Sequence, residues 1–351
     1  MGASRRCDCE FLCRNNTLNR RLIVHLPTMK NWKKTIFLFV IFACLTMAVG
    51  PFVVPVPELD GLVSEEEFID ADSKFIEIND VNIHYKEAGT GERMFILLHP
   101  FGGSTFSWRE VMDDFAAMGR VIAYDRPAFG ISERPMPENW LENPYGMKAN
   151  VEILRGLLDE FGVEKAVLVG NSAGGGLAVA FGLEYPERVE ALLLVDPGVG
   201  GGRGPQFPAW ALPLMWTPQM RHIGPLLMRD YQERLPNTIE REWYDGSKLT
   251  DEIRQEYLNL LRIKNWDRAF YELNFAPAYP ELRPLLPTLT VPTYIIAGQE
   301  DRLIRYWYFE AIANEIPNAK LTLIPQCGHV PQEECPVEFM KAANRYLMEV
   351  E

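Results

Sequence analysis

Ser172 lies in the heptapeptide GNSAGGG, surrounded by small residues. The preceding residues AVLVG predict a buried strand, and the following LAVAFGLEY predicts a helix. A strand that turns at once into a helix crowds the backbone, and glycine relieves that crowding. G-x-S-x-G in this context is typical of a nucleophilic serine held at a strained turn. A tightly packed turn with an incidental serine is the alternative.

A serine hydroxyl needs a base, and the chain has only five histidines to supply one. His329 follows the last expected strand in the segment PQCGHVPQEECP, at the edge of the sheet where the serine turn also lies. We therefore predict that His329 is the base. His99 ends an earlier strand and is expected to shape a loop. The others lie in the N-terminal tail, an early hairpin and a helical insertion: His25, His84 and His222.

Two aspartates compete to orient this base. Asp301 follows the expected strand TYIIAG, and its choice gives the chain order serine, aspartate, histidine. Asp196 ends the expected strand ALLLVD and is the alternative. We favour Asp301 because of that order; Glu300 beside it is expected to point elsewhere.

Attack on a carbonyl also requires donors for the oxyanion that forms. One donor is expected from the residue after the nucleophile, which is the Ala173 N–H. The second is expected from the segment HPFGGS, and we choose the Phe101 N–H. Gly102 and Gly103 would let substrate approach the backbone closely. An ordinary glycine turn is the alternative for this segment.

The elements that position these residues alternate between strand and helix. Alternation from Phe75 predicts a mostly parallel sheet covered by helices on both faces. It breaks at residues rich in Pro, Trp and Arg, which predict an inserted helical cap. The expected divisions are 1–34 (basic tail), 35–56 (membrane segment), 70–197 (first core part), 198–285 (cap) and 286–351 (second core part).

The N-terminal apolar run is long enough to approach the thickness of a bilayer. Residues 1–34 carry eight Lys or Arg and two acidic residues, a net charge of +6, and acidic residues follow the run. By the positive-inside rule the tail is cytoplasmic and the body is exported. We favour an uncleaved membrane anchor; a secreted protein after signal cleavage near Ala48–Gly50 is the alternative, and Met29 is an alternative start.

Composition excludes several classes of function. The whole chain has a net charge of −13, so the residues after the tail carry −19, and nucleic acid is not an expected partner. The sequence has no phosphate loop, no dinucleotide fingerprint and no matched zinc-ligand pairs, so we expect no cofactor and no metal. Cys327 and Cys335 could form a disulfide outside the cytoplasm, which the sequence leaves open. The sequence does not indicate the oligomeric state of the protein.

Residues 70–351 resemble the α/β-hydrolase fold superfamily. The resemblance rests on HPFGGS, DRPAFGISERP, GNSAGG, LLLVDP, GQEDRLI and GHVPQEECP, in the family's order. Members commonly have His-Gly where this chain has His99-Pro100, and proline has no N–H. The resemblance implies that Asp125 and Arg126 brace the site. Serine at position 172 argues against epoxide hydrolases and dehalogenases, whose nucleophile there is aspartate.

Acyl transfer to water is the chemistry that remains. The leading hypothesis is a carboxylic ester hydrolase for a small or lipophilic apolar ester, acting through an acyl-enzyme. The alternatives are carbon–carbon hydrolysis of a ring-cleavage product, amide or lactone hydrolysis, and a binding protein with vestigial turnover. Cap aromatic residues are expected to line an apolar acyl pocket with Gly102, although any one of them could be core: Trp210, Trp216, Trp243, Tyr244 and Trp266.

Overall fold

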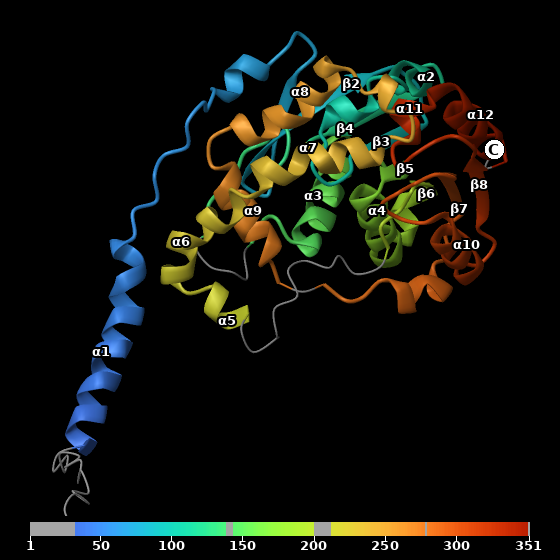
Figure 1. Ribbon diagram of the computed structural model, residues 1–351. Helices are drawn as coiled ribbons and strands as arrows, with labels where there is room; N and C mark the ends of the chain where they lie inside the picture. Colours follow the sequence, from blue (N-terminus) through green and yellow to red (C-terminus); the bar gives the residue numbers. More distant parts are fainter. Residues whose placement is uncertain (1–31, 138–142, 200–211, 278, 350–351) are drawn as a thin grey trace, which may run out of the picture. The chain divides into compact units, whose positions relative to one another are not determined.

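The computed structural model describes residues 32–137, 143–199, 212–277 and 279–349 (Figure 1). Residues Met1–Ala48 and Val49–Glu351 form separate compact units. Helix α1 (Trp32–Val53) is 22 residues long and has no buried residue. It is long and apolar enough to cross a membrane, a test that signal sequences also pass. The helix overlaps the expected membrane segment 35–56, whose place in a membrane stays a prediction.

The larger unit is built on a sheet with the strand order β1-β2-β4-β3-β5-β6-β7-β8. β1 pairs with β2 and β2 with β4 in antiparallel fashion, and all other neighbours are parallel. The central β3 and β5 are buried along their whole length, as strands covered on both faces should be. The strands are β1 (Lys74–Ile78), β2 (Val81–Ala88), β3 (Met94–Leu98), β4 (Arg120–Tyr124), β5 (Ala166–Asn171), β6 (Val189–Val195), β7 (Thr293–Gly298) and β8 (Lys320–Ile324).

Helices cover both faces of this sheet (Figure 1). One core cluster joins Ile96 and Leu98 to α3, α4 and α10, and the other joins Phe95 and Leu97 to α2 and α12. The clusters divide alternate residues because strand side chains alternate between faces. The doubly wound, mostly parallel class is therefore confirmed. These helices are α2 (Met112–Ala116), α3 (Met147–Glu160), α4 (Ala173–Glu184), α10 (Tyr306–Glu315), α11 (Pro331–Glu334) and α12 (Pro336–Leu347).

Between β6 and β7 the described residues form helices. Apolar side chains of α7, α8 and α9 build a third core cluster together with Phe129 and Val330, which come from loops at the carboxyl edge of the sheet. These helices are α5 (Leu212–Met215), α6 (Pro218–Met228), α7 (Tyr231–Glu242), α8 (Asp251–Asn259) and α9 (Trp266–Asn274). All lie within residues 198–285; the limits of this insertion and of the two core parts stay predictions.

Candidate active site

Ser172 occupies a strained turn between β5 and α4. Its φ is 51° and its ψ is −113°, a combination that side chains rarely adopt. Its N–H donates to the Val195 carbonyl at 2.9 Å, and its carbonyl accepts the Gly198 N–H at 2.9 Å. A Cβ on Gly174 would lie 2.1 Å from the Leu98 carbonyl oxygen. Only glycine fits there, which explains the small residues around the serine.

His329, in the loop after β8, is hydrogen-bonded to Asp301, in the loop after β7. Nδ1 of His329 lies 2.6 Å from Oδ2 of Asp301, and both side chains are buried. Oδ1 of Asp301 accepts the N–H groups of Leu303 and Ile304 at 2.6 and 2.9 Å. These donors stabilise the charged carboxylate, and that charge favours a proton on Nδ1. Nε2 then presents a lone pair that can accept a proton.

Asn171, the last residue of β5, joins the serine turn to the histidine loop. Its Nδ2 donates to the carbonyls of Val195 and His329 at 3.0 and 3.1 Å, and its Oδ1 accepts from Gln332 at 3.2 Å. Ser172 and His329 are thus held at the same edge of the sheet. Within the described residues the Ser172 hydroxyl makes no hydrogen bond to His329, and such contacts commonly tighten when substrate binds.

A buried histidine shapes the loop after β3. Nδ1 of His99 donates to the Pro100 carbonyl at 2.7 Å, and Nε2 accepts the Arg126 N–H at 3.0 Å. Burial, followed by the Arg126 charge, lowers the pKa of His99 to about 3, so the ring is neutral. The Arg126 guanidinium donates to the carbonyls of His99 and Pro100. Arg126 therefore braces the loop that His99 shapes.

The N–H groups of Phe101 and Ala173 stay the predicted oxyanion donors. Ala173 begins α4, where the N-terminal end of the helix dipole favours negative charge. Gly102 has φ +78°, so the loop turns sharply directly after Phe101. The Phe101 ring contacts three aromatic rings, which give the loop an apolar neighbourhood: Phe129, Tyr231 and Phe270.

Two of the tryptophans expected to line the substrate pocket are fully buried in the insertion. Trp243 and Trp266 have exposed fractions of 1 % and 0 %, and both belong to the cluster that contains Val330. Leu235 of α7 lies 3.9 Å from the position that a Cβ on Gly102 would take. Trp210 lies outside the described residues. The structure gives both described rings a packing role, and their contact with substrate stays a prediction.

Main-chain hydrogen bonds connect the insertion to the histidine loop. The His329 N–H donates to the Glu242 carbonyl, at the end of α7, at 2.6 Å. The Glu334 carboxylate is buried and accepts three backbone N–H groups, at 2.6, 3.1 and 2.7 Å: those of Gly328, Tyr244 and Asp245. One carboxylate therefore fixes the insertion to the residue that precedes His329.

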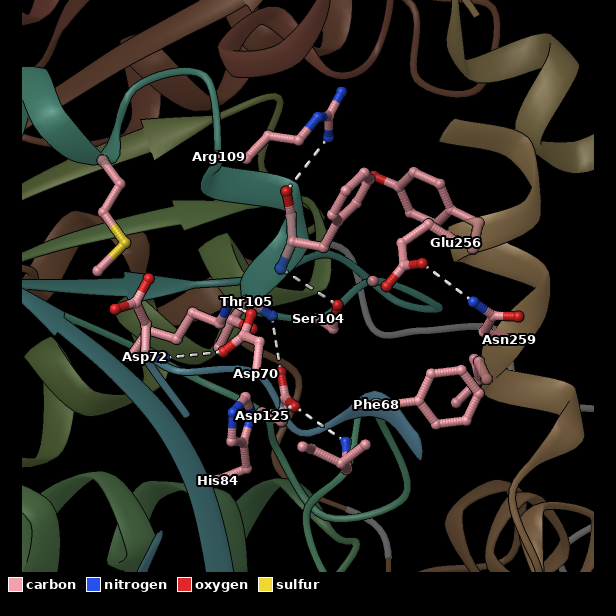
Figure 2. Close-up of a pocket in the computed structure, with 18 of the residues that line it drawn as sticks. Phe68, Asp70, Asp72, His84, Ser104, Thr105, Arg109, Asp125, Glu256 and Asn259 are labelled. Carbon is pink, nitrogen blue, oxygen red and sulfur yellow. Dashed lines mark hydrogen bonds and ion pairs between the residues drawn. The ribbon is translucent and has the colours of Figure 1, made fainter. Parts of the chain in front are cut away.

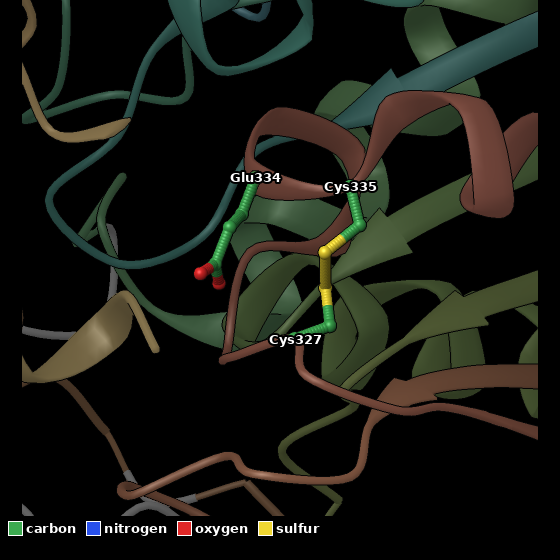
Figure 3. A group of neighbouring side chains, drawn as sticks. All are labelled: Cys327, Glu334 and Cys335. Carbon is green, nitrogen blue, oxygen red and sulfur yellow. A yellow bond between two sulfur atoms is a disulfide. The ribbon is translucent and has the colours of Figure 1, made fainter. Parts of the chain in front are cut away.

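Cys327 and Cys335 form a disulfide that closes the histidine loop, and Glu334 lies beside it (Figure 3). Sequence reasoning left this pairing open and missed the roles of Glu334 and Asn171. The available signals were weak: an amide at the end of an apolar strand, and an acid inside a loop flanked by cysteines.

A cavity of about 480 Å³ lies beside the loop after β3 (Figure 2). It is lined by residues of β2, of α8 and of the loop from Gly102 to Phe106; among the described residues that line it, the predicted nucleophile, base and acid do not occur. Asp125 accepts hydrogen bonds from His84 Nδ1 and the Thr105 N–H, both at 2.7 Å. Asp125 is thus a structural brace.

Among the residues that the structure describes, two groups of side chains have the composition of a metal site. In the first, the sulfurs of Cys327 and Cys335 are joined in the disulfide. In the second, ligand atoms of Asp196, Asp301 and His329 all lie within 4.8 Å of one another. The hydrogen bond between His329 Nδ1 and Asp301 Oδ2 occupies two of those atoms.

The family model described as alpha/beta hydrolase fold matches residues 93–336. The chain belongs to this family. It is therefore a hydrolase by family, with the serine, aspartate and histidine of the predicted triad all inside the matched range.

Named relatives specify the chemistry of similar proteins. The chain is 32 % identical over 288 residues to a 2-hydroxy-6-oxononadienedioate/2-hydroxy-6-oxononatrienedioate hydrolase from Burkholderia vietnamiensis, covering 79 % of this chain and 96 % of that one. It is 30 % identical to a 2-hydroxy-6-oxo-6-phenylhexa-2,4-dienoate hydrolase from Burkholderia cepacia, covering 78 % and 96 %. A meta-cleavage product hydrolase from Pseudomonas fluorescens superposes with a TM-score of 0.61 at 27 % identity, covering 79 % and 98 %.

These relatives overturn the leading functional hypothesis. The expectation of a carboxylic ester hydrolase acting on an apolar ester is wrong, because the relatives are named for carbon–carbon hydrolysis. The physical reason is that both reactions begin with attack on a carbonyl carbon. The nucleophile, base and oxyanion donors are therefore shared, and the sequence motifs on which the ester hypothesis rested do not distinguish the bond that breaks.

Proposed function

We propose that this protein hydrolyses a carbon–carbon bond in a 2-hydroxy-6-oxo-dienoate, the class of compound produced by ring cleavage. The observation that carries the proposal is the combination of serine at the strained turn with a 32 % identity that spans 96 % of a relative named for this reaction.

The proposed chemistry starts with the substrate itself. Carbon 5, beside the ketone at position 6, is part of a double bond and cannot accept the electron pair of the breaking bond. The proton of the 2-hydroxyl group must therefore first move to carbon 5. The substrate then has ketones at positions 2 and 6, and the CH2 group at position 5 separates the distal ketone from the remaining double bond. Cleavage of the bond to the distal ketone now leaves a dienolate, in which the electron pair is delocalised onto the oxygen at position 2.

Ser172 attacks the distal ketone and His329 takes its proton at Nε2, while Asp301 stabilises the imidazolium. The N–H groups of Phe101 and Ala173 stabilise the oxyanion. Collapse of this intermediate breaks the carbon–carbon bond, gives an acyl-Ser172 and releases the dienolate, which takes on oxygen the proton held by His329 and leaves the imidazole neutral. Water, deprotonated by His329, hydrolyses the acyl group and frees a carboxylic acid.

The test uses the full chain in detergent with 2-hydroxy-6-oxo-6-phenylhexa-2,4-dienoate and 2-hydroxy-6-oxononadienedioate. Loss of the conjugated chromophore and formation of the carboxylic acid, at least 100-fold slower in Ser172→Ala, is the expected result. A folded protein that leaves both dienoates intact while turning over aryl esters would refute the proposal. Failure on every substrate, without labelling of Ser172 by a fluorophosphonate, would favour a binding protein.

We also propose that the protein is anchored by α1 with its larger unit outside the cytoplasm. Three observations support this: the apolar helix, the basic residues before it, and the Cys327–Cys335 disulfide, a bond that persists in oxidising compartments. Carbonate-washed membranes should retain the full chain, and protease added to spheroplasts should digest its larger unit. Release into the medium after cleavage, or complete protection from protease, would contradict the proposal.

A further inference from the structure

Two carboxyl groups lie beside His329. Asp196 follows β6 and Asp301 follows the neighbouring β7, and their exposed fractions are 0 % and 1 %. Oxygen atoms of both groups and a ring nitrogen of His329 lie within 4.8 Å of one another. The proposed mechanism uses Asp301 and leaves Asp196 without a role.

Two buried carboxylates this close cannot both remain charged at low cost, so one of them holds a proton. The hydrogen bonds distinguish the two. Asp301 has three donors: two backbone N–H groups on Oδ1 and the His329 ring on Oδ2. Within the described part of the chain Asp196 has a single donor, the Gly298 N–H, shared between its oxygens at 3.0 and 3.3 Å. The charge therefore belongs on Asp301 and the proton on Asp196.

The electrostatics agree with this assignment. Burial, followed by the charge of Asp301, raises the pKa of Asp196 well above its ordinary value, and Glu334 adds to the effect. This direction agrees with the count of donors, which assigns the proton to Asp196 and makes its carboxyl group a hydrogen-bond donor.

The backbone of Asp196 has a strained conformation. Asp196 has φ 41°, in the left-handed region that residues other than glycine seldom occupy. Its N–H donates to the Ile296 carbonyl at 3.1 Å, and Gly198, two residues on, donates to the Ser172 carbonyl. A strained residue between the nucleophile turn and the acid loop suggests a role for its side chain.

We propose that Asp196 is a positioning residue: as a neutral acid it donates a hydrogen bond to the Asp301 carboxylate and so holds that carboxylate toward His329. The inference rests on the proposed triad. It does not depend on which bond the enzyme breaks, because ester and carbon–carbon hydrolysis would use the same serine, histidine and aspartate.

The test measures the rate at which a fluorophosphonate labels Ser172 in the full chain, together with kcat and KM on the dienoates. D196N keeps a donor for Asp301 and an acceptor for Gly298, so it should label within about threefold of the wild type. D196A removes the donor and should be slower by about tenfold or more, with KM little changed. D301N removes the carboxylate itself and should lose about 10⁴-fold.

A double variant separates positioning from a general loss of structure. If Asp196 acts through Asp301, D196A should cause no further loss in the D301N background. Thermal unfolding midpoints report folding, and D196L, similar in size to aspartate, replaces D196A if the latter does not fold. Wild-type labelling that is abolished by EDTA would overturn the inference in favour of a cation site.

The other outcomes are equally decisive. A D196N variant as slow as D301N would show that a charged Asp196 is needed, and would make it the acid of the triad. A D196A variant as fast as the wild type would remove its role altogether. A wild type that labels rapidly but cleaves no dienoate would refute the proposed function and leave this inference standing, whereas a wild type that never labels refutes the triad on which both rest.

Discussion

Replacement of Glu334 by alanine should lower the free energy of unfolding and also slow the reaction of Ser172 with a fluorophosphonate. The substitution leaves the N–H groups of Gly328, Tyr244 and Asp245 without their acceptor, and Glu334 is 2 % exposed. A buried donor without a partner costs about 1–3 kcal/mol, and water entering the vacated space would recover part of that. We expect the free energy of unfolding to fall by about 3–5 kcal/mol in Glu334→Ala.

The free energy of unfolding of Glu334→Gln should lie between those of Glu334→Ala and the wild type. It keeps one oxygen and turns the other into a donor, so at least one N–H group faces another donor; the expected loss is about 1.5–3 kcal/mol. Because Gly328 precedes the base His329, we also expect slower labelling of Ser172, by about tenfold to 100-fold in Glu334→Ala.

Urea unfolding of the full chain measures the free energy, and fluorophosphonate labelling measures the site. Glu338→Ala is the matched control, since Glu338 is exposed on the next helix, α12, and should change stability by about 0.5 kcal/mol or less. If Glu334→Ala were as stable and as reactive as Glu338→Ala, the carboxylate would not hold the insertion to the histidine loop and our reasoning would be wrong.

Three further predictions concern the loop after β3, the disulfide and the serine turn. His99 has a pKa of about 3 in the folded state, below its value in the unfolded chain. Its contribution to the free energy of unfolding is therefore complete above about pH 6.5 and is lost as pH falls toward 3. The wild type should therefore lose about 1.4 kcal/mol per pH unit more than His99→Asn between pH 6 and 4, and equal slopes in urea titrations would contradict this. Joint Cys327→Ser and Cys335→Ser substitution opens a loop of sequence separation 8 and should cost about 2.5 kcal/mol in urea, whereas an unchanged midpoint would mean that the bond is absent in solution. Gly174→Ala should abolish labelling of Ser172, because its Cβ would lie 2.1 Å from a backbone oxygen; full labelling would show that the turn relaxes easily.

The sequence predicted the core of the molecule well because its signals are local. Continuous apolar runs indicate strands buried on both faces. The turn that holds the serine leaves no room for a side chain at Gly174, so its motif can be recognised from the glycine in the sequence. The hydrogen bond between Asp301 and His329 follows from two loops that leave adjacent strands at the same edge.

Other features depend on contacts between distant segments, which no local pattern encodes. The links made by Glu334 and Asn171 join residues that are 90 and 158 positions apart. A tryptophan that fills a core and one that faces a ligand have the same local signature, so Trp243 and Trp266 could not be assigned from sequence. The ester hypothesis failed for a chemical reason, because attack on a ketone and on an ester use the same side chains.

The hydrogen bond from His329 to Glu242 has a consequence for how this enzyme tolerates change. The acceptor is a main-chain carbonyl, which every amino acid supplies, so the link survives any exchange of side chain at position 242 that leaves the backbone in place. A single residue added to or removed from the end of α7 would instead rotate that carbonyl away from the histidine. The insertion can therefore vary in composition far more freely than in length at this point, and a cap transplanted from a relative would succeed only if its register against the histidine loop were kept.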